Sequence, residues 1–177
     1  MRRTTYIPLA AACAALMALA AGGPAAAQEK KGDVTLKVGK VKDLLAEIGR
    51  HKGKVVVVDF WADFCIPCKQ EFPNLVRLHN TRAGDGLVAI SATVDDPEDK
   101  ELALKFLKQQ KATFFNILVE NPTDAQNHWD FTAVPAVAVY GRDGKLARVF
   151  TNDDPKNQFT YKDVEAFIEP MLKQGKK

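Results

Sequence analysis

Two cysteines separated by two residues, Cys65 and Cys68, are the side chains of this sequence best suited to chemistry. They follow an apolar run, and the residues after them have helical spacing. Cys65 should therefore lie at the start of a helix, where unpaired amides and the positive end of the helix dipole stabilise a thiolate. A thiolate attacks disulfides, and a sulfur one helical turn later can reach back to the first. The pair predicts dithiol–disulfide exchange through a redox-active Cys65–Cys68 disulfide, with Cys65 as nucleophile and Cys68 as resolving cysteine.

Asp59 is the predicted proton-transfer group for Cys68, acting directly or through water. It follows four consecutive valines, residues 55–58, in a run too apolar for a strand with one wet face. A buried carboxylate without a partner is costly, so burial should raise its pKa toward the range useful for proton transfer. The alternative is a residue at the end of the strand, exposed at the rim of the sheet.

Metal binding is the rival interpretation of a Cys-x-x-Cys pair. A closed zinc site needs four cysteine or histidine ligands. The histidines available are His51, in a turn, and His79 and His128, on separate predicted helices. Nothing in the sequence indicates that they converge, so we predict neither a metal nor another cofactor.

Composition places the chain among ordinary globular proteins. Its 177 residues are 46% hydrophobic and 27% charged, which suits one compact domain. The formal net charge is +3, from 25 basic and 22 acidic side chains. Without Arg2 and Arg3 the balance is 23 against 22, a net charge of +1. This balance gives no support for nucleic acid or an anionic membrane as partner.

The N-terminus has the pattern of a secretory signal. Arg2 and Arg3 are followed by an apolar stretch over residues 7–22, by Pro24 and by the small residues 25–27. The alternatives are a retained membrane anchor and lipidation at Cys13. We predict a signal peptide over residues 1–27, a flexible leader over 28–33, one domain over 34–173 and a polar tail over 174–177. The mature protein would then be periplasmic or otherwise extracytoplasmic, soluble, and left with the one cysteine pair.

Hydrophobic periodicity predicts alternating strands and helices followed by a hairpin and a last helix. The order indicates an α/β domain with a mixed sheet between helices. The expected strands cover residues 34–38, 54–60, 87–94, 114–119, 136–140 and 146–150. The expected helices cover residues 41–48, 66–78, 97–110, a segment from 121 that holds Trp129, and 160–172, with Thr160 as cap.

Residues 58–69, Val-Asp-Phe-Trp-Ala-Asp-Phe-Cys-Ile-Pro-Cys-Lys, resemble the active-site strand, turn and helix of the thioredoxin superfamily. Val134-Pro135, before the strand at 136–140, resembles the proline that is cis in that family and packs beside the cysteines. The resemblance implies a thioredoxin-like three-layer sandwich. It also implies a surface that binds substrate, made of Trp61, Phe64, Ile66, Pro67, Val134 and Pro135.

Residues 69–73 and the inserted strand and helix over 86–119 are similar to the exported TlpA/ResA-like branch of the superfamily. That similarity implies a protein-disulfide reductase outside the cytoplasm, supplied with electrons by a membrane thiol carrier. We also expect a monomer. Its substrates would be protein disulfides, with apocytochrome c among the candidates.

The sequence departs from the family pattern at two positions. Phe64 stands where a second Trp is usual, which removes an indole donor. Asp59 matches the buried acid of thioredoxins, whereas the exported branch often has Asn. The alternatives on the same fold are a disulfide-donating oxidase, a thiol peroxidase, and a metal-binding chaperone or other non-enzymatic binding module.

Overall fold

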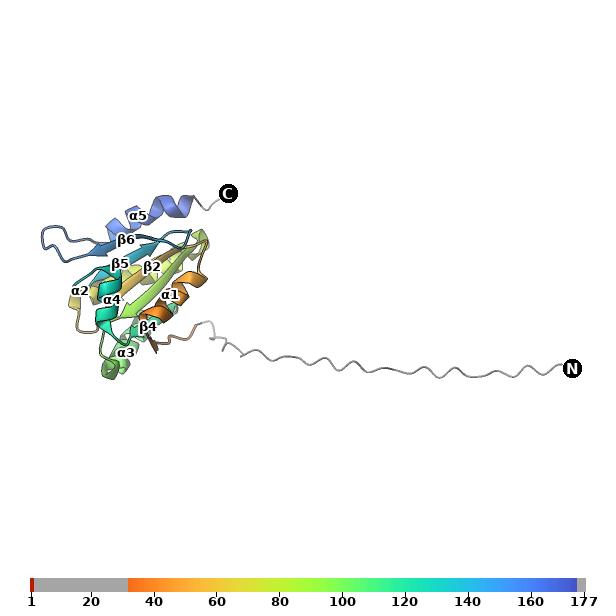
Figure 1. Cartoon of the computed structure of the whole chain (residues 1–177), viewed down its shortest axis with the longest axis horizontal. Coiled ribbons are helices and arrows are strands. Elements are labelled where there is room, and N and C mark those ends of the chain that lie inside the picture. The colour runs from red at the N-terminus through yellow and green to blue at the C-terminus, as the bar shows by residue number, and fades with distance from the viewer. Residues whose placement is uncertain (2–31, 175–177) are drawn as a thin grey trace. The chain divides into compact units, whose positions relative to one another are not determined.

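A computed structural model describes Met1 and residues 32–174. The predicted signal peptide after Met1, most of the predicted leader and residues 175–177 lie outside the described part. In chain order the elements are β1 (Lys37–Gly39), α1 (Val41–Arg50), β2 (Val55–Trp61), α2 (Ile66–Arg82), a 3-10 turn η1 (Ala83–Asp85), β3 (Leu87–Thr93), a second 3-10 turn η2 (Pro97–Asp99), α3 (Lys100–Gln110), β4 (Phe115–Val119), α4 (Pro122–Trp129), β5 (Ala136–Tyr140), β6 (Leu146–Thr151) and α5 (Tyr161–Lys173) (Figure 1).

The strands form one six-stranded sheet in the order β1-β4-β3-β2-β5-β6. The pairs β1–β4, β4–β3 and β3–β2 are parallel, whereas β2–β5 and β5–β6 are antiparallel. This mixed sheet between helices confirms the predicted α/β fold. The first strand is shorter than predicted, because the register of β1 with β4 pairs only residues 37–39. The predicted helix over residues 97–110 is present, with its first three residues in the 3-10 turn η2 and the rest in α3.

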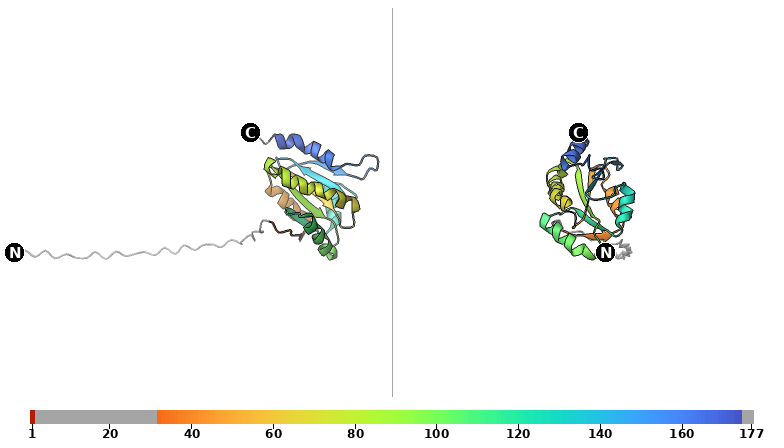
Figure 2. Two further views of the ribbon diagram at one scale, coloured as in Figure 1. Left: turned by 180° about the vertical axis from the view of Figure 1, so that it is seen from behind. Right: turned by 90° about the vertical axis from the view of Figure 1, so that its left-hand side faces the viewer.

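The sheet separates two hydrophobic cores. Helices α2, α3 and α5 cover one face, and α1 and α4 cover the other (Figures 1 and 2). All seven residues of β2 are buried, and successive side chains point to opposite faces. Val55, Val57 and Trp61 join the α2, α3 and α5 core, whereas Val56, Val58 and Phe60 join the α1 and α4 core.

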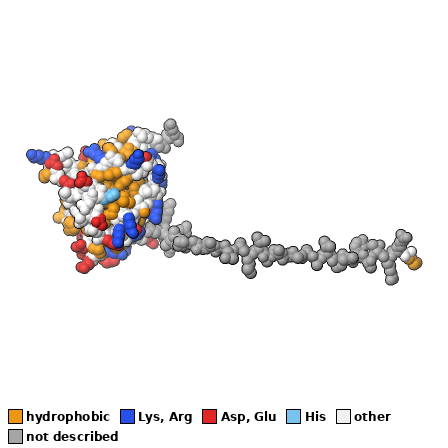
Figure 3. Space-filling model, in the orientation of Figure 1, with side chains coloured by type: hydrophobic (Ala, Val, Ile, Leu, Met, Phe, Trp, Pro, Cys, Tyr) orange, Lys and Arg blue, Asp and Glu red, His pale blue; other side chains and the backbone are white. Residues whose placement is uncertain are grey.

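The face that carries α1 and α4 keeps hydrophobic side chains within reach of solvent near its middle (Figure 3). The partly buried hydrophobic residues of that core are Val41, Leu45, Val88, Phe115, Val134 and Val149. Within the described residues, no helix is long and apolar enough to span a membrane.

Local capping fixes where α5 begins. The hydroxyl and the backbone N–H of Thr160 each donate to Asp163 Oδ2 at 2.8 Å. The predicted Thr160 cap is therefore present, as one half of a capping box. The capping box makes Tyr161 the first residue of α5, and the side chain of Tyr161 is buried.

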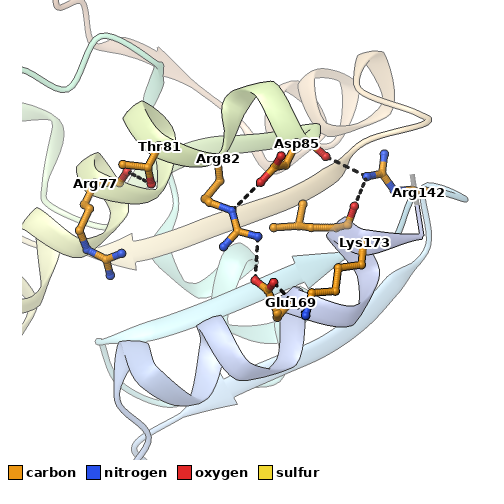
Figure 4. Close-up of polar contacts among 8 residues, drawn as sticks. Arg77, Thr81, Arg82, Asp85, Arg142, Glu169 and Lys173 are labelled. Atoms are coloured by element: carbon orange, nitrogen blue, oxygen red, sulfur yellow. Dashed lines mark hydrogen bonds and ion pairs between the residues drawn. The ribbon is translucent and has the colours of Figure 1, made fainter. Parts of the chain in front are cut away.

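Arg142, in the turn between β5 and β6, joins three other parts of the chain. Its guanidinium donates to the backbone carbonyl oxygens of Gly53, Asp85, Met171 and Leu172, at distances of 2.9 to 3.2 Å. Two of these carbonyls lie in the last turns of α5, where a cation also offsets the negative end of the helix dipole. Figure 4 shows Arg142 between the end of η1 and the end of α5.

A chain of ion pairs lies next to Arg142 and ties α2 to α5. Arg82 donates to Asp85 at 2.8 Å and to Glu169 at 2.7 Å, and Glu169 pairs with Lys173 at 3.4 Å (Figure 4). These side chains are partly exposed, so each pair contributes little to stability.

We predict that Arg142→Lys lowers the free energy of unfolding by about 2 kcal/mol, because an ammonium group cannot reproduce a planar fork of donors to four carbonyls. Urea denaturation measures the change. The matched control is Arg77→Lys, which alters an exposed ion pair with Glu165 and should cost less than about 1 kcal/mol. Equal losses in the two variants would contradict a special role for Arg142.

Candidate active site

The cysteine pair lies where β2 gives way to α2. After Trp61 the chain turns, and the N–H of Cys65 donates to the carbonyl of Ala62 at 3.1 Å. Cys65 is the N-cap of α2, and Pro67 occupies one of its first two positions, where its missing N–H costs no helical hydrogen bond. Cys65 and Cys68 are joined by a disulfide bond, with 7% and 2% of their surfaces exposed. The predicted placement at the start of a helix is confirmed.

The start of α2, though not the nearby Val134 carbonyl, favours negative charge on the Cys65 sulfur once the disulfide is reduced. The backbone N–H of Cys68 donates to Cys65 Sγ at 3.2 Å, as expected for a free amide at a helix start. The carbonyl oxygen of Val134 lies 3.8 Å from the same sulfur. In the reduced protein the amide and the helix dipole would stabilise a thiolate at Cys65 rather than at Cys68, which lies inside the helix.

The Val134–Pro135 peptide bond is cis, as predicted. Its position beside the cysteines follows from the strand pairing. Because β5 is antiparallel to β2, with Phe60 opposite Ala136, the start of β5 lies at the end of β2 where the cysteine turn begins. Two segments about 70 residues apart in the sequence thus meet at one edge of the sheet.

Asp59 is buried, with 3% of its surface exposed, so the alternative of an exposed rim residue is wrong. Burial raises the pKa of its carboxyl to about 7, a hydrogen bond from the Tyr161 hydroxyl to Oδ2 lowers it in part, and the negative charge of Glu71 adds to the rise. A carboxyl with this pKa exists in both protonation states near neutral pH, which suits proton transfer.

Asp59 and Cys68 both line a cavity of about 170 Å³. Its walls include Asp59, Cys68, Glu71, Pro135, Gln158 and Tyr161. The space is large enough for water, and its polar walls supply the partners that a buried water needs. The cavity thus offers a route between Cys68, the carboxyl of Asp59 and solvent.

The predicted substrate-binding residues differ widely in accessibility. Phe64 and Ile66 flank Cys65 with exposed fractions of 74% and 70%, an unusual exposure for side chains so apolar. Trp61, in contrast, is fully buried and packs against Phe72 and Phe106, with ring centroids 5.3 and 4.9 Å apart. Trp61 therefore lies in the core, and its side chain presents no surface to a substrate.

Asp95, which lies between the predicted strand over 87–94 and the predicted helix over 97–110, has a role that sequence reasoning missed. Asp95 is 2% exposed, and both its carboxylate oxygens accept from the backbone N–H of Asp63 at 2.9 Å. Asp63 in turn accepts from Lys69 Nζ at 2.8 Å. The turn that leads to Cys65 is thus held from β3 and from α2. Only the location of Asp95 directly after an apolar strand hinted at this contact.

The three histidines lie in separate environments. His51 contacts Glu47 at the end of α1, His79 packs against Phe114, and His128 packs against its neighbour Trp129. Across Met1 and residues 32–174, no group of three or more histidine, cysteine or acidic side chains is arranged to hold a metal ion.

Curated proteins similar to this chain include two thiol-disulfide oxidoreductases named ResA. The protein of Halalkalibacterium halodurans is 23% identical over 123 residues, which cover 70% of this chain and 65% of the relative. The protein of Bacillus subtilis is 26% identical over 105 residues, which cover 59% of this chain and 57% of the relative. The chain thus spans less than two thirds of the length of these relatives.

Solved structures share the fold. A putative thiol:disulfide interchange protein DsbE from Chlorobium tepidum matches with a TM-score of 0.58 at 24% identity, over 72% of this chain and 84% of the other. The thioredoxin-like fold inferred from residues 58–69 and from Val134-Pro135 is therefore confirmed. A sequence model of the AhpC/TSA family matches residues 28–149, well over half of the 177 residues. The chain belongs to the AhpC/TSA family.

Proposed function

We propose that this chain is an extracytoplasmic thiol–disulfide oxidoreductase that reduces disulfides in protein substrates. The observation that carries the proposal is the environment of Cys65: its sulfur is bonded to Cys68, accepts from a helix-start amide and lies beside the Val134 carbonyl. This arrangement fits a sulfur that forms and breaks disulfides. The ResA relatives, which are named thiol-disulfide oxidoreductases, support the same activity.

The proposed reaction begins with the reduced protein. The Cys65 thiolate attacks one sulfur of a substrate disulfide, so that a Cys65–substrate disulfide forms and the other substrate sulfur leaves as a thiolate. Cys68 then gives its proton to Asp59 and attacks Cys65 Sγ. The second substrate sulfur leaves, and Cys65–Cys68 is oxidised. Two electrons pass to the substrate, and a membrane dithiol carrier returns two electrons to the protein.

The exposed side chains around Cys65 fit a polypeptide substrate. Phe64 and Ile66 offer apolar contact, and Val134, just before β5, offers a backbone carbonyl to an extended segment. Because apolar and backbone contacts depend little on the side chains of the substrate, they suit exported proteins with accessible disulfides, apocytochrome c among them. An oxidase on the same fold would use these residues in the opposite direction, so the reduction potential separates the two functions.

We predict that the Cys65–Cys68 couple is reducing. Equilibration with glutathione should give a potential well below that of strong oxidants, which lie near about −120 mV. The reduced protein should also reduce insulin, and the rate should be lost in Cys65→Ser. A potential near that of the strong oxidants would overturn the reductase direction.

We predict that Cys68→Ser accumulates mixed disulfides between Cys65 and substrate proteins, because the resolving sulfur is absent. Non-reducing gels followed by mass spectrometry of the trapped partners measure this. The double variant Cys65→Ser/Cys68→Ser is the matched control and should trap nothing. Absence of trapped partners in Cys68→Ser would contradict an exchange role.

We predict that Asp59→Asn slows resolution of the mixed disulfide by roughly tenfold or more above pH 7, since Asn cannot accept the Cys68 proton. Below pH 7 the wild-type carboxyl is increasingly protonated, so the two rates should converge there. Single-turnover kinetics with a peptide disulfide, followed from pH 5 to 9, measure the rates. Identical profiles would remove Asp59 from the mechanism.

Stability provides a control for the same variant. The pKa of Asp59 is about 7 in the folded protein and 3.8 in the unfolded chain. Between these two pH values the folded protein binds the proton more tightly, so the free energy of unfolding falls as pH rises from about 4 to about 7. Asp59→Asn removes this cost and should be more stable than wild type above pH 7, by at most on the order of 4 kcal/mol. A variant that is slower and yet more stable is not slow because it unfolds.

A further inference from the structure

Tyr161 and Asp59 meet inside the protein although 102 residues separate them in the sequence. The Tyr161 hydroxyl donates to Asp59 Oδ2, and each residue is 3% exposed. Among the described residues, Tyr161 is the one hydrogen-bond partner of this carboxylate. The contact joins the first residue of α5 to β2, and both residues line the cavity that Cys68 also lines.

The position of the Tyr161 hydroxyl is fixed by the cap of α5 and by packing of the ring in the core. The capping box between Thr160 and Asp163 fixes the start of α5, and the Tyr161 ring lies in the same core as Cys68 and Phe72. A hydroxyl fixed in this way donates more strongly to a carboxylate than to a neutral carboxyl, because a hydrogen bond to a charged acceptor is the stronger one.

The groups that face Asp59 come from two helices. From α2, Cys68 shares its cavity and Glu71 adds negative charge. From α5, Tyr161 donates the hydrogen bond, and Glu165 acts on Tyr161 through its charge. The described charged neighbours are acidic, so the Tyr161 hydroxyl is the group that opposes burial and favours the ionised carboxyl.

Tyr161 itself does not exchange a proton in this arrangement. Burial and the neighbouring Asp59 raise its pKa well above the usual value of 10. It therefore stays protonated over the pH range in which Asp59 titrates, and it acts as a fixed donor.

We propose that Tyr161 is a positioning residue that holds Asp59 in the cavity beside Cys68 and favours its ionised form, so that α5 sets the pH at which the resolving cysteine is activated. This inference rests on the proposed exchange function. The proton passes from the Cys68 thiol to the Asp59 carboxylate, the Cys68 sulfur bonds to Cys65, the Cys65–substrate bond breaks, and the Tyr161 O–H bond stays intact throughout.

The test is Tyr161→Phe, which keeps the ring and removes the hydroxyl. A ¹³C NMR titration of the Asp59 carboxyl in the reduced protein should show its midpoint at higher pH by roughly one pH unit. The pH profile for resolution of the mixed disulfide should move in the same direction. At pH 7 the rate should fall by about fivefold, because the ionised fraction drops from about half to about one tenth.

The matched control is Tyr140→Phe, which also removes a buried hydroxyl. The Tyr140 hydroxyl accepts from Trp129 Nε1 at 2.7 Å in the core on the other face of the sheet. That variant should lose stability and leave both the Asp59 midpoint and the pH profile in place. A second control is Tyr161→Phe in an Asp59→Asn background, where the pH profile should not respond to the loss of the hydroxyl.

The outcomes separate this inference from the function on which it rests. An unchanged Asp59 midpoint in Tyr161→Phe would overturn it, and so would a shifted midpoint without a matching shift in the rate profile. An equal response to Tyr161→Phe in the Asp59→Asn background would also overturn it. Failure of Cys68→Ser to trap substrates would refute the exchange function itself, since trapping does not require Tyr161.

Discussion

Strand β2 carries the site because it is buried on both faces and paired on both edges. It runs parallel to β3 and antiparallel to β5, so its C-terminal end lies beside the C-terminal end of β3 and the start of β5. Every residue along it is buried. Because β2 is held on both faces and both edges, the position of the turn that follows it is fixed. Cys65 and the Val134 carbonyl lie close together at that turn.

The same burial creates the chemistry of Asp59. The alternation of β2 points Asp59 to the face that α2 and α5 cover, between Val57 and Trp61. A carboxyl in that position is costly to ionise. The protein retains it with a hydroxyl from α5 and a small cavity beside Cys68. The opposition between desolvation and one hydrogen bond leaves the carboxyl poised near neutral pH.

The turn before Cys65 has its own support. Asp95, after β3, binds the Asp63 amide, and Lys69, in the first turns of α2, binds the Asp63 carboxylate. These contacts restrain the segment between the end of β2 and Cys65. Phe64 and Ile66 are exposed and contribute little packing. The polar contacts of Asp63 hold the backbone of the turn that carries Phe64 in their place.

Much of the architecture could be predicted, because the relevant signals are local. Four valines in a row indicate a strand buried on both faces, and the Cys-x-Pro-Cys spacing indicates a helix start. The strand and helix order followed from periodicity, with errors only at ends such as that of β1, where pairing with β4 decides the length. Trp61 was predicted to bind substrate, but it is buried against Phe72 and Phe106 and has a packing role instead. Those neighbours come from other elements, so local sequence could not predict the burial.

The sequence alone determined the fold class of this protein and the placement of its cysteine pair at the start of a helix. The spacing of two sulfurs and the start of a helix are properties of a few neighbouring residues. The tertiary structure alone decided which distant groups surround those sulfurs. In the sequence, Tyr161 is an aromatic residue at the start of a predicted helix, and Asp95 is an acidic residue between a predicted strand and a predicted helix. Their contacts with Asp59 and Asp63 exist only once sheet pairing and helix packing bring those segments together, because a hydrogen bond depends on distance in space.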